Sequence, residues 1–358
     1  MKVLIIGAGV AGLAIGWRLR QAGADVTILE RAQPAHGASW AAAGMIAVAG
    51  EMGGAQTAEA EYGHHSSALW PDFARELEAA SGQEIFYRRS GALMIARTPQ
   101  EAAAFDRWSG VDRLTAAQSA AKEPMLTADI AGGIWAPDDA YVDNRALGAA
   151  LAAAFVRSGG SLISNEAVVE FHVESNRAVA VATPFRRHEA DVFILAAGAW
   201  SSQIGGLPVD VLPPVKPVKG EIIAVKPPPG VALPNSIVWG NGIYLVPRTD
   251  RLLIGATATE SGFDTALSDG AVDWLSSRAI ALMPALRRWE VIEHWAGLRP
   301  GSPDGMPILG PTKVQGLFAA TGQYRNGILF APAIAETMSR LVLEQAEGPP
   351  AFDPRRFS

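Results

Sequence analysis

The sequence predicts an α/β domain built on a parallel sheet, interleaved with an α+β domain built on a mostly antiparallel sheet. Three observations lead to this prediction. A glycine-rich strand–turn–helix unit occupies residues 3–30, and residues 218–257 alternate like an antiparallel meander between Pro, Gly, Asn and Asp turns. Strand–turn–helix patterns then return in residues 316–344. A chain of 358 residues is long enough for two cores.

The N-terminal unit carries the most specific pattern. An apolar strand at residues 3–6 runs into Gly-x-Gly-x-x-Gly at 7–12, and a second strand at 26–29 ends on Glu30. Glycines in this order permit a tight turn, the approach of a pyrophosphate and close helix–strand packing, and the later acid binds a ribose hydroxyl. The pattern predicts a dinucleotide with an unphosphorylated ribose, and leaves NAD and FAD open. An ordinary βαβ unit with turn glycines is the alternative.

Composition argues against several classes of protein. A net charge of −6 without a Lys/Arg cluster argues against nucleic-acid binding. The absence of cysteine excludes disulfides, thiolate metal sites, thiol catalysis and a cysteine-linked cofactor, and the six histidines lack metal-ligand spacing. Glycines interrupt the apolar N-terminal run, which argues against a signal peptide, and no segment has about 18 uninterrupted apolar residues. We therefore expect a soluble, cytoplasmic protein without metal or membrane attachment.

The remaining elements follow from periodicity and from turn residues. A loop of small residues after Glu30 would let a flat ligand lie against the backbone. The later patterns predict, in chain order, a helix over 67–80, short strands over 85–87 and 92–95, a helix from 144 to about 157, strands over 161–164 and 193–195, four meander strands within 220–257, a strand over 316–321 and a helix over 328–344. We assign 1–84, 145–212 and 295–358 to the nucleotide domain, and 85–144 and 213–294 to the substrate domain.

Motifs along nearly the whole chain resemble the FAD-dependent oxidoreductases of the D-amino-acid oxidase type, and within them the glycine oxidases of thiamine biosynthesis. The matching segments are SWAAAGMIA, HSSALW, AAGAWS, PVKGE, YLVPR, IGAT, WAGLRPGSPDGMPILG and YRNGILFAPA. The resemblance selects FAD over NAD and implies a Rossmann-like, glutathione-reductase-type FAD-binding domain. FAD would be held non-covalently, because this chain has no cysteine to match the tether of some relatives.

The resemblance also implies how FAD lies. Its diphosphate would rest on the glycine turn, its ribose on Glu30 and its adenine against Val168, while the YRNGILFAPA helix would point its N-terminus at the flavin N1/C2=O edge, which becomes negative on reduction. The cofactor-binding residues predicted in this way are Gly7, Gly9, Val10, Ala11, Gly12, Glu30, Arg31, Ala42, Ala43, Gly44, Met45, Val168, Ala197, Gly198, Trp200, Gly322, Arg325, Asn326, Gly327 and Ile328.

Four residues are predicted to contact substrate. Arg299 in GLRPG would bind a carboxylate through its planar guanidinium, and Tyr244 would add a hydroxyl contact. Arg325 would contact substrate, or would hold a lid or a backbone carbonyl. Ala258 stands where glycine oxidases often carry methionine, so it would enlarge the side-chain pocket.

The implied reaction is oxidation of glycine, sarcosine, an N-alkylglycine or a small D-amino acid by hydride transfer from Cα to flavin N5. No protein acid or base is needed, and oxygen then yields hydrogen peroxide beside the 2-oxo acid and ammonia or amine. A dehydrogenase that passes electrons to a quinone or another carrier, and a non-catalytic flavoprotein subunit, are the alternatives. Relatives form dimers or tetramers, so a homo-oligomer is possible by resemblance.

Overall fold

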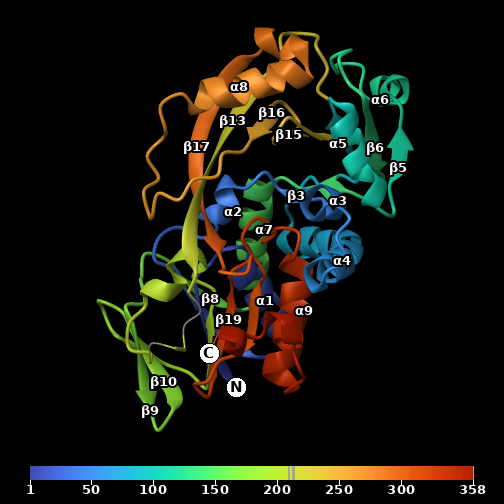
Figure 1. Ribbon diagram of the computed structural model, residues 1–358. Helices are drawn as coiled ribbons and strands as arrows, with labels where there is room; N and C mark the ends of the chain where they lie inside the picture. Colours follow the sequence, from blue (N-terminus) through green and yellow to red (C-terminus); the bar gives the residue numbers. More distant parts are fainter. Residues whose placement is uncertain (209, 212–213, 358) are drawn as a thin grey trace.

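Two large sheets organise the protein, one in each lobe of the molecule (Figure 1). The computed structural model describes residues 1–208, 210–211 and 214–357. Both described chain ends lie in the lower lobe of the view, and the helices α1, α4, α7 and α9 gather beside the sheet there. The upper lobe holds the second sheet, with α8 lying across it.

The lower lobe contains a six-stranded, mostly parallel sheet, which confirms the α/β prediction. Central β1 pairs in parallel with β2 and β12, so that Ile5 lies between Ile28 and Ile194. These apolar strands are buried on both faces, as parallel sheets covered by helices usually are. In sheet order the strands are β18 (Ile308–Pro311), β19 (Leu317–Thr321), β12 (Val192–Leu195), β1 (Lys2–Ile6), β2 (Asp25–Leu29) and β8 (Ser161–Ile163).

Four helices build the core of this lobe. α1 contacts both α7 and α9, and α4 contacts the same two helices. The apolar faces meet in one cluster that includes Trp17, Trp70, Phe73 and Phe155. The helices are α1 (Val10–Gln21), α4 (Ala58–Ser81), α7 (Asn144–Arg157) and α9 (Ala331–Leu343).

The upper lobe is an eight-stranded sheet whose pairs are antiparallel except for β4 with β14, which confirms the predicted mostly antiparallel sheet. One face packs against α8 (Ala271–Leu282), and the opposite face carries Ile222, Tyr244 and Trp295. In sheet order the strands are β17 (Glu290–Gly301), β13 (Lys216–Lys226), β16 (Leu252–Gly255), β15 (Ile243–Pro247), β14 (Ile237–Gly240), β4 (Ala92–Ala96), β6 (Gly132–Ala136) and β5 (Asp112–Leu114).

Smaller elements complete the described chain. None of the described helices is long and apolar enough to span a membrane. The remaining strands are β3 (Met45–Ile46), β7 (Ala140–Tyr141), β9 (Glu170–Glu174), β10 (Arg177–Ala182) and β11 (Arg187–Glu189); the short helices are α2 (Ala38–Ala41), α3 (Val48–Met52), α5 (Pro99–Ala104), α6 (Ala116–Lys122), and 3-10 turns at Phe105–Arg107, Gly198–Gln203, Pro284–Arg288, Pro350–Phe352 and Pro354–Phe357.

Three predicted elements differ from the structure. Helix α4 begins at Ala58 rather than at residue 67, because the Thr57 hydroxyl caps it by accepting a hydrogen bond from the Ala60 N–H at 3.2 Å. Residues 85–87 are not a strand, and Phe86 has a positive φ of 55°. Helix α9 begins at Ala331 rather than at 328, with a proline in its first turn, where a helix accepts one.

The predicted domain division can be placed on this fold. The strands of the eight-stranded sheet fall within 92–136 and 216–301. Strand β17 spans the predicted boundary between residues 294 and 295. The predicted boundary at 212/213 lies on residues outside those that the structure describes, as does the predicted domain end at 358.

Candidate cofactor and substrate site

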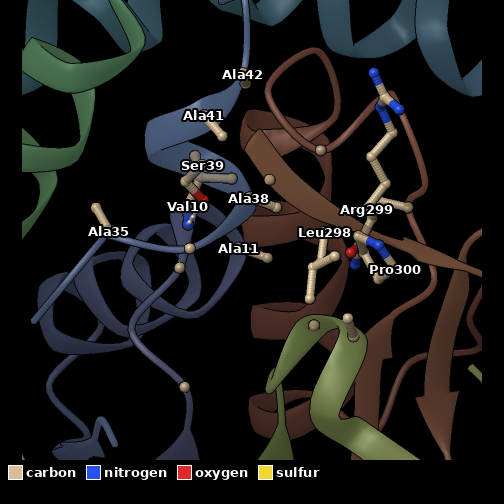
Figure 2. Close-up of a pocket in the computed structure, with 18 of the residues that line it drawn as sticks. Val10, Ala11, Ala35, Ala38, Ser39, Ala41, Ala42, Leu298, Arg299 and Pro300 are labelled. Carbon is tan, nitrogen blue, oxygen red and sulfur yellow. Dashed lines mark hydrogen bonds between the residues drawn. The ribbon is translucent and has the colours of Figure 1, made fainter. Parts of the chain in front are cut away.

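A cavity of about 410 Å³ lies between the two lobes. The glycine turn and the following loops line one part of it, and β13, β15 and β17 line another. Figure 2 shows the two sides facing one another, with Val10, Ala11 and Ala38 on one and Leu298, Arg299 and Pro300 on the other. Pockets of this size at domain interfaces commonly bind small molecules or cofactors.

The three glycines of the N-terminal turn have different structural roles. Gly7 has a φ of +105°, and a Cβ there would lie 2.5 Å from the Ala196 carbonyl oxygen. A Cβ on Gly12 would lie 2.1 Å from the Gly7 carbonyl oxygen, so that glycine lets helix and turn meet. Gly9 has an ordinary φ of −73°, and a Cβ there would meet only the Ser39 Oγ, at 3.5 Å. Protein packing therefore demands the first and third glycines, and leaves the space beside Gly9 for a ligand.

The polar groups around the turn are oriented toward that space. Glu30 accepts hydrogen bonds from the backbone N–H of Ala8 at 2.8 Å and of Ala32 at 3.0 Å, which fixes its carboxylate at the cavity wall. The N–H of Val10, in the first turn of α1, donates to the Ser39 Oγ at 2.9 Å (Figure 2). No acidic side chain occupies that first turn, so the positive end of the helix is available to an anion.

An aromatic wall lies next to Glu30. The guanidinium carbon of Arg31 lies 3.4 Å from the centroid of the Trp200 ring, and both residues line the cavity together with Val168. Partial burial lowers the pKa of Arg31, and the neighbouring Glu30 opposes that shift. The flat, partly apolar surface suits a ring system such as adenine.

The loop of small residues at 41–45 is fixed by side chains from three other segments. The Trp295 Nε1–H donates to the Ala41 carbonyl at 3.0 Å, and the Arg248 guanidinium donates to the Ala43 carbonyl at 2.7 Å. Asn144 donates to the Trp40 carbonyl at 2.7 Å. Burial lowers the pKa of Arg248 to about 10, opposed by nearby Asp143. The loop is therefore a rigid backbone wall against which a flat ligand can lie.

Arg299 on β17 and Tyr244 on β15 converge on the far end of the cavity, although β13 and β16 lie between their strands in the sheet. Each lies over a glycine: a Cβ on Gly220 would approach the Arg299 guanidinium to 2.2 Å, and one on Gly255 would approach the Tyr244 ring to 2.5 Å. One guanidinium N–H of Arg299 donates to the Thr257 carbonyl at 3.1 Å. Burial raises the pKa of Tyr244, opposed by Arg299 and Arg325, so its hydroxyl stays protonated at neutral pH.

A second arginine at this end is paired with an acid. The Arg325 Nε lies 2.8 Å from the Glu51 Oε2, and an Arg325 amino group donates to the Glu51 Oε1 at 3.4 Å. Burial raises the pKa of Glu51, and Arg325, then Arg299, oppose that shift. Arg325 also lies 5.8 Å from the centroid of Trp239, whose ring meets Tyr244 edge-on.

Most predicted site residues line this one cavity. Of the predicted substrate residues, Arg299, Tyr244 and Arg325 do so, whereas Ala258 is exposed and is not among the lining residues. Asn326 is buried and donates to the Glu59 carboxylate at 2.9 Å instead of lining the cavity. The predicted cofactor residues that line the cavity are Gly7, Gly9, Val10, Ala11, Glu30, Arg31, Ala42, Ala43, Gly44, Met45, Val168, Ala197, Gly198, Trp200, Arg325, Gly327 and Ile328; Gly12 and Gly322 are not among the lining residues.

Several lining residues were not predicted. They include Ser39, Glu51 and Gln323. Ser39 and Glu51 contact residues distant in sequence, Val10 and Arg325, and Gln323 lines the cavity. Ser39 stands within the matching SWAAAGMIA segment, which is a signal that could have identified it. Glu51 has no comparable local signal, since its partner is 274 residues away.

The helix expected to point at the flavin needs correction. Gly327 and Ile328 line the cavity, but they belong to a turn that precedes α9 and is closed by the Phe330 N–H donating to the Asn326 carbonyl at 2.8 Å. The backbone presented to the cavity is therefore this turn, and the first residue of α9, Ala331, is not among the lining residues.

Comparisons with known proteins identify the family. Residues 2–341 match the family of FAD dependent oxidoreductases. The chain is 36% identical to the glycine oxidase of Geobacillus kaustophilus, covering 99% of this chain and 96% of that protein, and the crystal structure of glycine oxidase from that organism superposes with a TM-score of 0.92 over 99% of this chain and 97% of that one. The iminodiacetate oxidase structure from Chelativorans sp. BNC1 has a TM-score of 0.87 at 29% identity, with 98% of each chain covered.

A third relative is longer than this chain. The bifunctional protein ThiO/ThiG of Synechocystis sp. is 36% identical over 99% of this chain, but the chain spans only 54% of that protein. The open space beside Gly9, the anchored Glu30 and the backbone wall at 41–45 fit a dinucleotide carrying a flat ring system. The family match covers most of the chain, so the protein belongs to the FAD dependent oxidoreductase family and its cofactor is FAD.

Proposed function

We propose that this protein oxidises glycine or another small amino acid or amine, such as sarcosine, an N-alkylglycine or a small D-amino acid, with oxygen as the electron acceptor. The protein is an FAD-dependent amino-acid or amine oxidase, and the products would be a 2-oxo acid, ammonia or an amine, and hydrogen peroxide. The observation that carries the proposal is the position of Arg299 and Tyr244 in the same cavity as the glycine turn and Glu30.

The side chains at the cavity end suit a substrate with one carboxylate. Arg299 presents a planar guanidinium, which can bind a carboxylate through two parallel hydrogen bonds. Tyr244 is buried and protonated, so its hydroxyl can donate a further hydrogen bond. Held in this way, a small amino acid keeps its Cα–H bond in one orientation, which is the main requirement for hydride transfer.

The protein needs little acid–base chemistry of its own. FAD, when bound, supplies the two-electron oxidant. The chain supplies the carboxylate contact, the rigid loop at 41–45 and a cavity enclosed between two lobes. Among the residues that the structure describes, no group of three or more His, Cys, Asp or Glu side chains is arranged to hold a metal ion.

A substrate panel tests the proposal. Glycine, sarcosine, N-ethylglycine, D-alanine and D-proline are supplied to the FAD-loaded protein, with peroxide formation measured in air and dye reduction measured without oxygen. We expect peroxide with at least one of these substrates. Dye reduction without peroxide would identify a dehydrogenase, and no bleaching of the anaerobic flavin by any amine would favour a non-catalytic flavoprotein. Ala258→Met in the same panel should leave the substrate preference unchanged, because Ala258 is exposed and does not line the cavity.

A further inference from the structure

The charged side chains at the substrate end of the cavity are unequal in number. Arg299 and Arg325 each carry a positive charge, and Glu51 carries the one negative charge beside them. These three residues leave one net positive charge facing the bound substrate. A ligand with a single carboxylate neutralises this one positive charge.

The two arginines also differ in their partners within the protein. Glu51 occupies the Nε edge of Arg325, with contacts of 2.8 and 3.4 Å to its two oxygens. Arg299 forms no salt bridge among the described residues: it donates to the uncharged backbone carbonyl of Thr257 and contacts the Tyr244 hydroxyl. The charge of Arg325 is therefore satisfied from within the protein, whereas that of Arg299 is left to the substrate.

Glu51 is held where it can serve as this counter-ion. Only 7% of its side chain is exposed, and it lies on α3, between the loop at 41–45 and helix α4. The Asp139 carboxylate accepts the N–H groups of Ala49 and Gly50 at 3.3 Å each, which fixes the backbone directly before Glu51. Separating Glu51 from Arg325 would cost free energy, because each charge would then be buried without its partner.

We propose that Glu51 is a specificity-determining residue that limits the substrate to one carboxylate by neutralising Arg325. An amine with two carboxylates, such as iminodiacetate, brings a second negative charge to a site whose second arginine is already paired. Removing the charge of Glu51 frees Arg325 to bind that second carboxylate. This inference rests on the proposed function, because it assumes that the substrate carboxylate binds at Arg299.

Non-reacting ligands test the inference apart from activity. Methoxyacetate and oxydiacetate are the ether analogues of sarcosine and iminodiacetate, and neither has an amine to oxidise. Their dissociation constants are measured on the FAD-loaded protein from changes in the flavin absorption spectrum. We expect the wild-type protein to bind methoxyacetate more tightly than oxydiacetate.

Glu51→Gln should move the ratio of the two dissociation constants toward oxydiacetate by about tenfold or more, the size of a charged hydrogen-bonded contact. Arg325→Gln alone should weaken methoxyacetate, since the charge of Glu51 then competes with the ligand for Arg299. The double variant Glu51→Gln/Arg325→Gln should recover methoxyacetate binding without gaining oxydiacetate. Glu59→Gln is the matched control: Glu59 is paired with Asn326 and is not among the lining residues, so its ratio should stay within twofold of wild type.

The outcomes separate the two proposals. A ratio that stays within twofold in Glu51→Gln, or a wild-type protein that binds both ligands equally, overturns the role of Glu51 even if sarcosine is oxidised. If Glu51→Gln does not fold, unchanged methoxyacetate binding in Arg325→Gln overturns it equally well. A shifted ratio in a protein that oxidises none of the amines supports the role of Glu51 and overturns the proposed function.

Discussion

At the scale of single residues, the sequence identified those whose role is set by a local motif. Gly7, Glu30 and Arg299 stand in recognisable segments, and all three line the cavity. Glu51 was not predicted, because a glutamate has no distinctive spacing before the fold brings it to Arg325. Ser39 was also missed, although it stands in the matching SWAAAGMIA segment. Contacts across hundreds of residues are a product of tertiary structure, and a single sequence does not display them.

Gly220 gives a prediction at this scale. Gly220→Ala should displace the Arg299 guanidinium, because the new methyl group would lie 2.2 Å from it. The displaced atoms are the end of a flexible side chain, so we expect substrate affinity to fall while the melting temperature changes little. Arg299→Ala sets the upper limit of this effect. It should remove about 1.5–3 kcal/mol of substrate-binding free energy, which lowers kcat/KM for the preferred substrate by about 10- to 150-fold.

The control for Gly220→Ala is Gly205→Ala. Gly205 does not line the cavity, and a Cβ there would meet the Val169 carbonyl at an ordinary 3.5 Å. Steady-state kinetics and thermal melts of the three variants complete the test. Wild-type kinetics in Gly220→Ala would show that Arg299 does not need the space above that glycine.

At the scale of elements, strands and helices with strong periodicity were predictable and their starting points were less so. The apolar run before the glycine turn and the meander after residue 218 became β1 and β13–β16. Helix α4 extends nine residues before its predicted start, since the cap at Thr57 outweighs the weaker apolar spacing of its first turns. The 12-residue strand β17 has no clear alternation, and its long pairing with β13 produces it.

Helix α3 gives a prediction at this scale, through the buried Asp139 that fixes its first turn. Burial raises the pKa of Asp139 to about 7, opposed by the N–H groups of Ala49 and Gly50. The folded protein therefore holds a proton that the unfolded chain releases near pH 4, so this residue makes the fold less stable as the pH rises from about 4 to about 7. Asp139→Asn cannot ionise and should remove that part of the pH dependence.

Thermal melts at pH 5 and pH 8 measure this effect. The wild-type protein should lose more stability between the two pH values than Asp139→Asn, by an amount on the order of a few kcal/mol. Asp138→Asn serves as the control, since Asp138 is exposed and its ion pair with Arg89 lies at the surface. Parallel changes in all three proteins would mean that Asp139 is ionised in the folded state across this range.

At the scale of the whole molecule, the cavity exists only because the two lobes meet. The lower lobe supplies the glycine turn and Glu30, and the upper lobe supplies Tyr244 from β15 and Arg299 from β17, two strands that Figure 1 labels. The sequence assigned segments to each half from the different periods of their motifs, and that division stays a prediction. It did not predict how the halves face one another, since that depends on contacts such as those of Arg248 and Trp295 with the loop at 41–45.

FAD should stabilise this two-lobed structure without a covalent bond. A ligand that binds only the folded protein adds about 2.7 kcal/mol at a free concentration 100 times its dissociation constant. The melting temperature of FAD-depleted protein should therefore rise with added FAD, and rise much less with FMN, which lacks the adenosine half that Glu30 and Arg31 are placed to bind. Equal stabilisation by FMN would contradict the assigned adenosine site.

Acid precipitation of the FAD-loaded protein tests how the cofactor is attached. The yellow colour should stay in the supernatant, and colour in the pellet would contradict non-covalent binding.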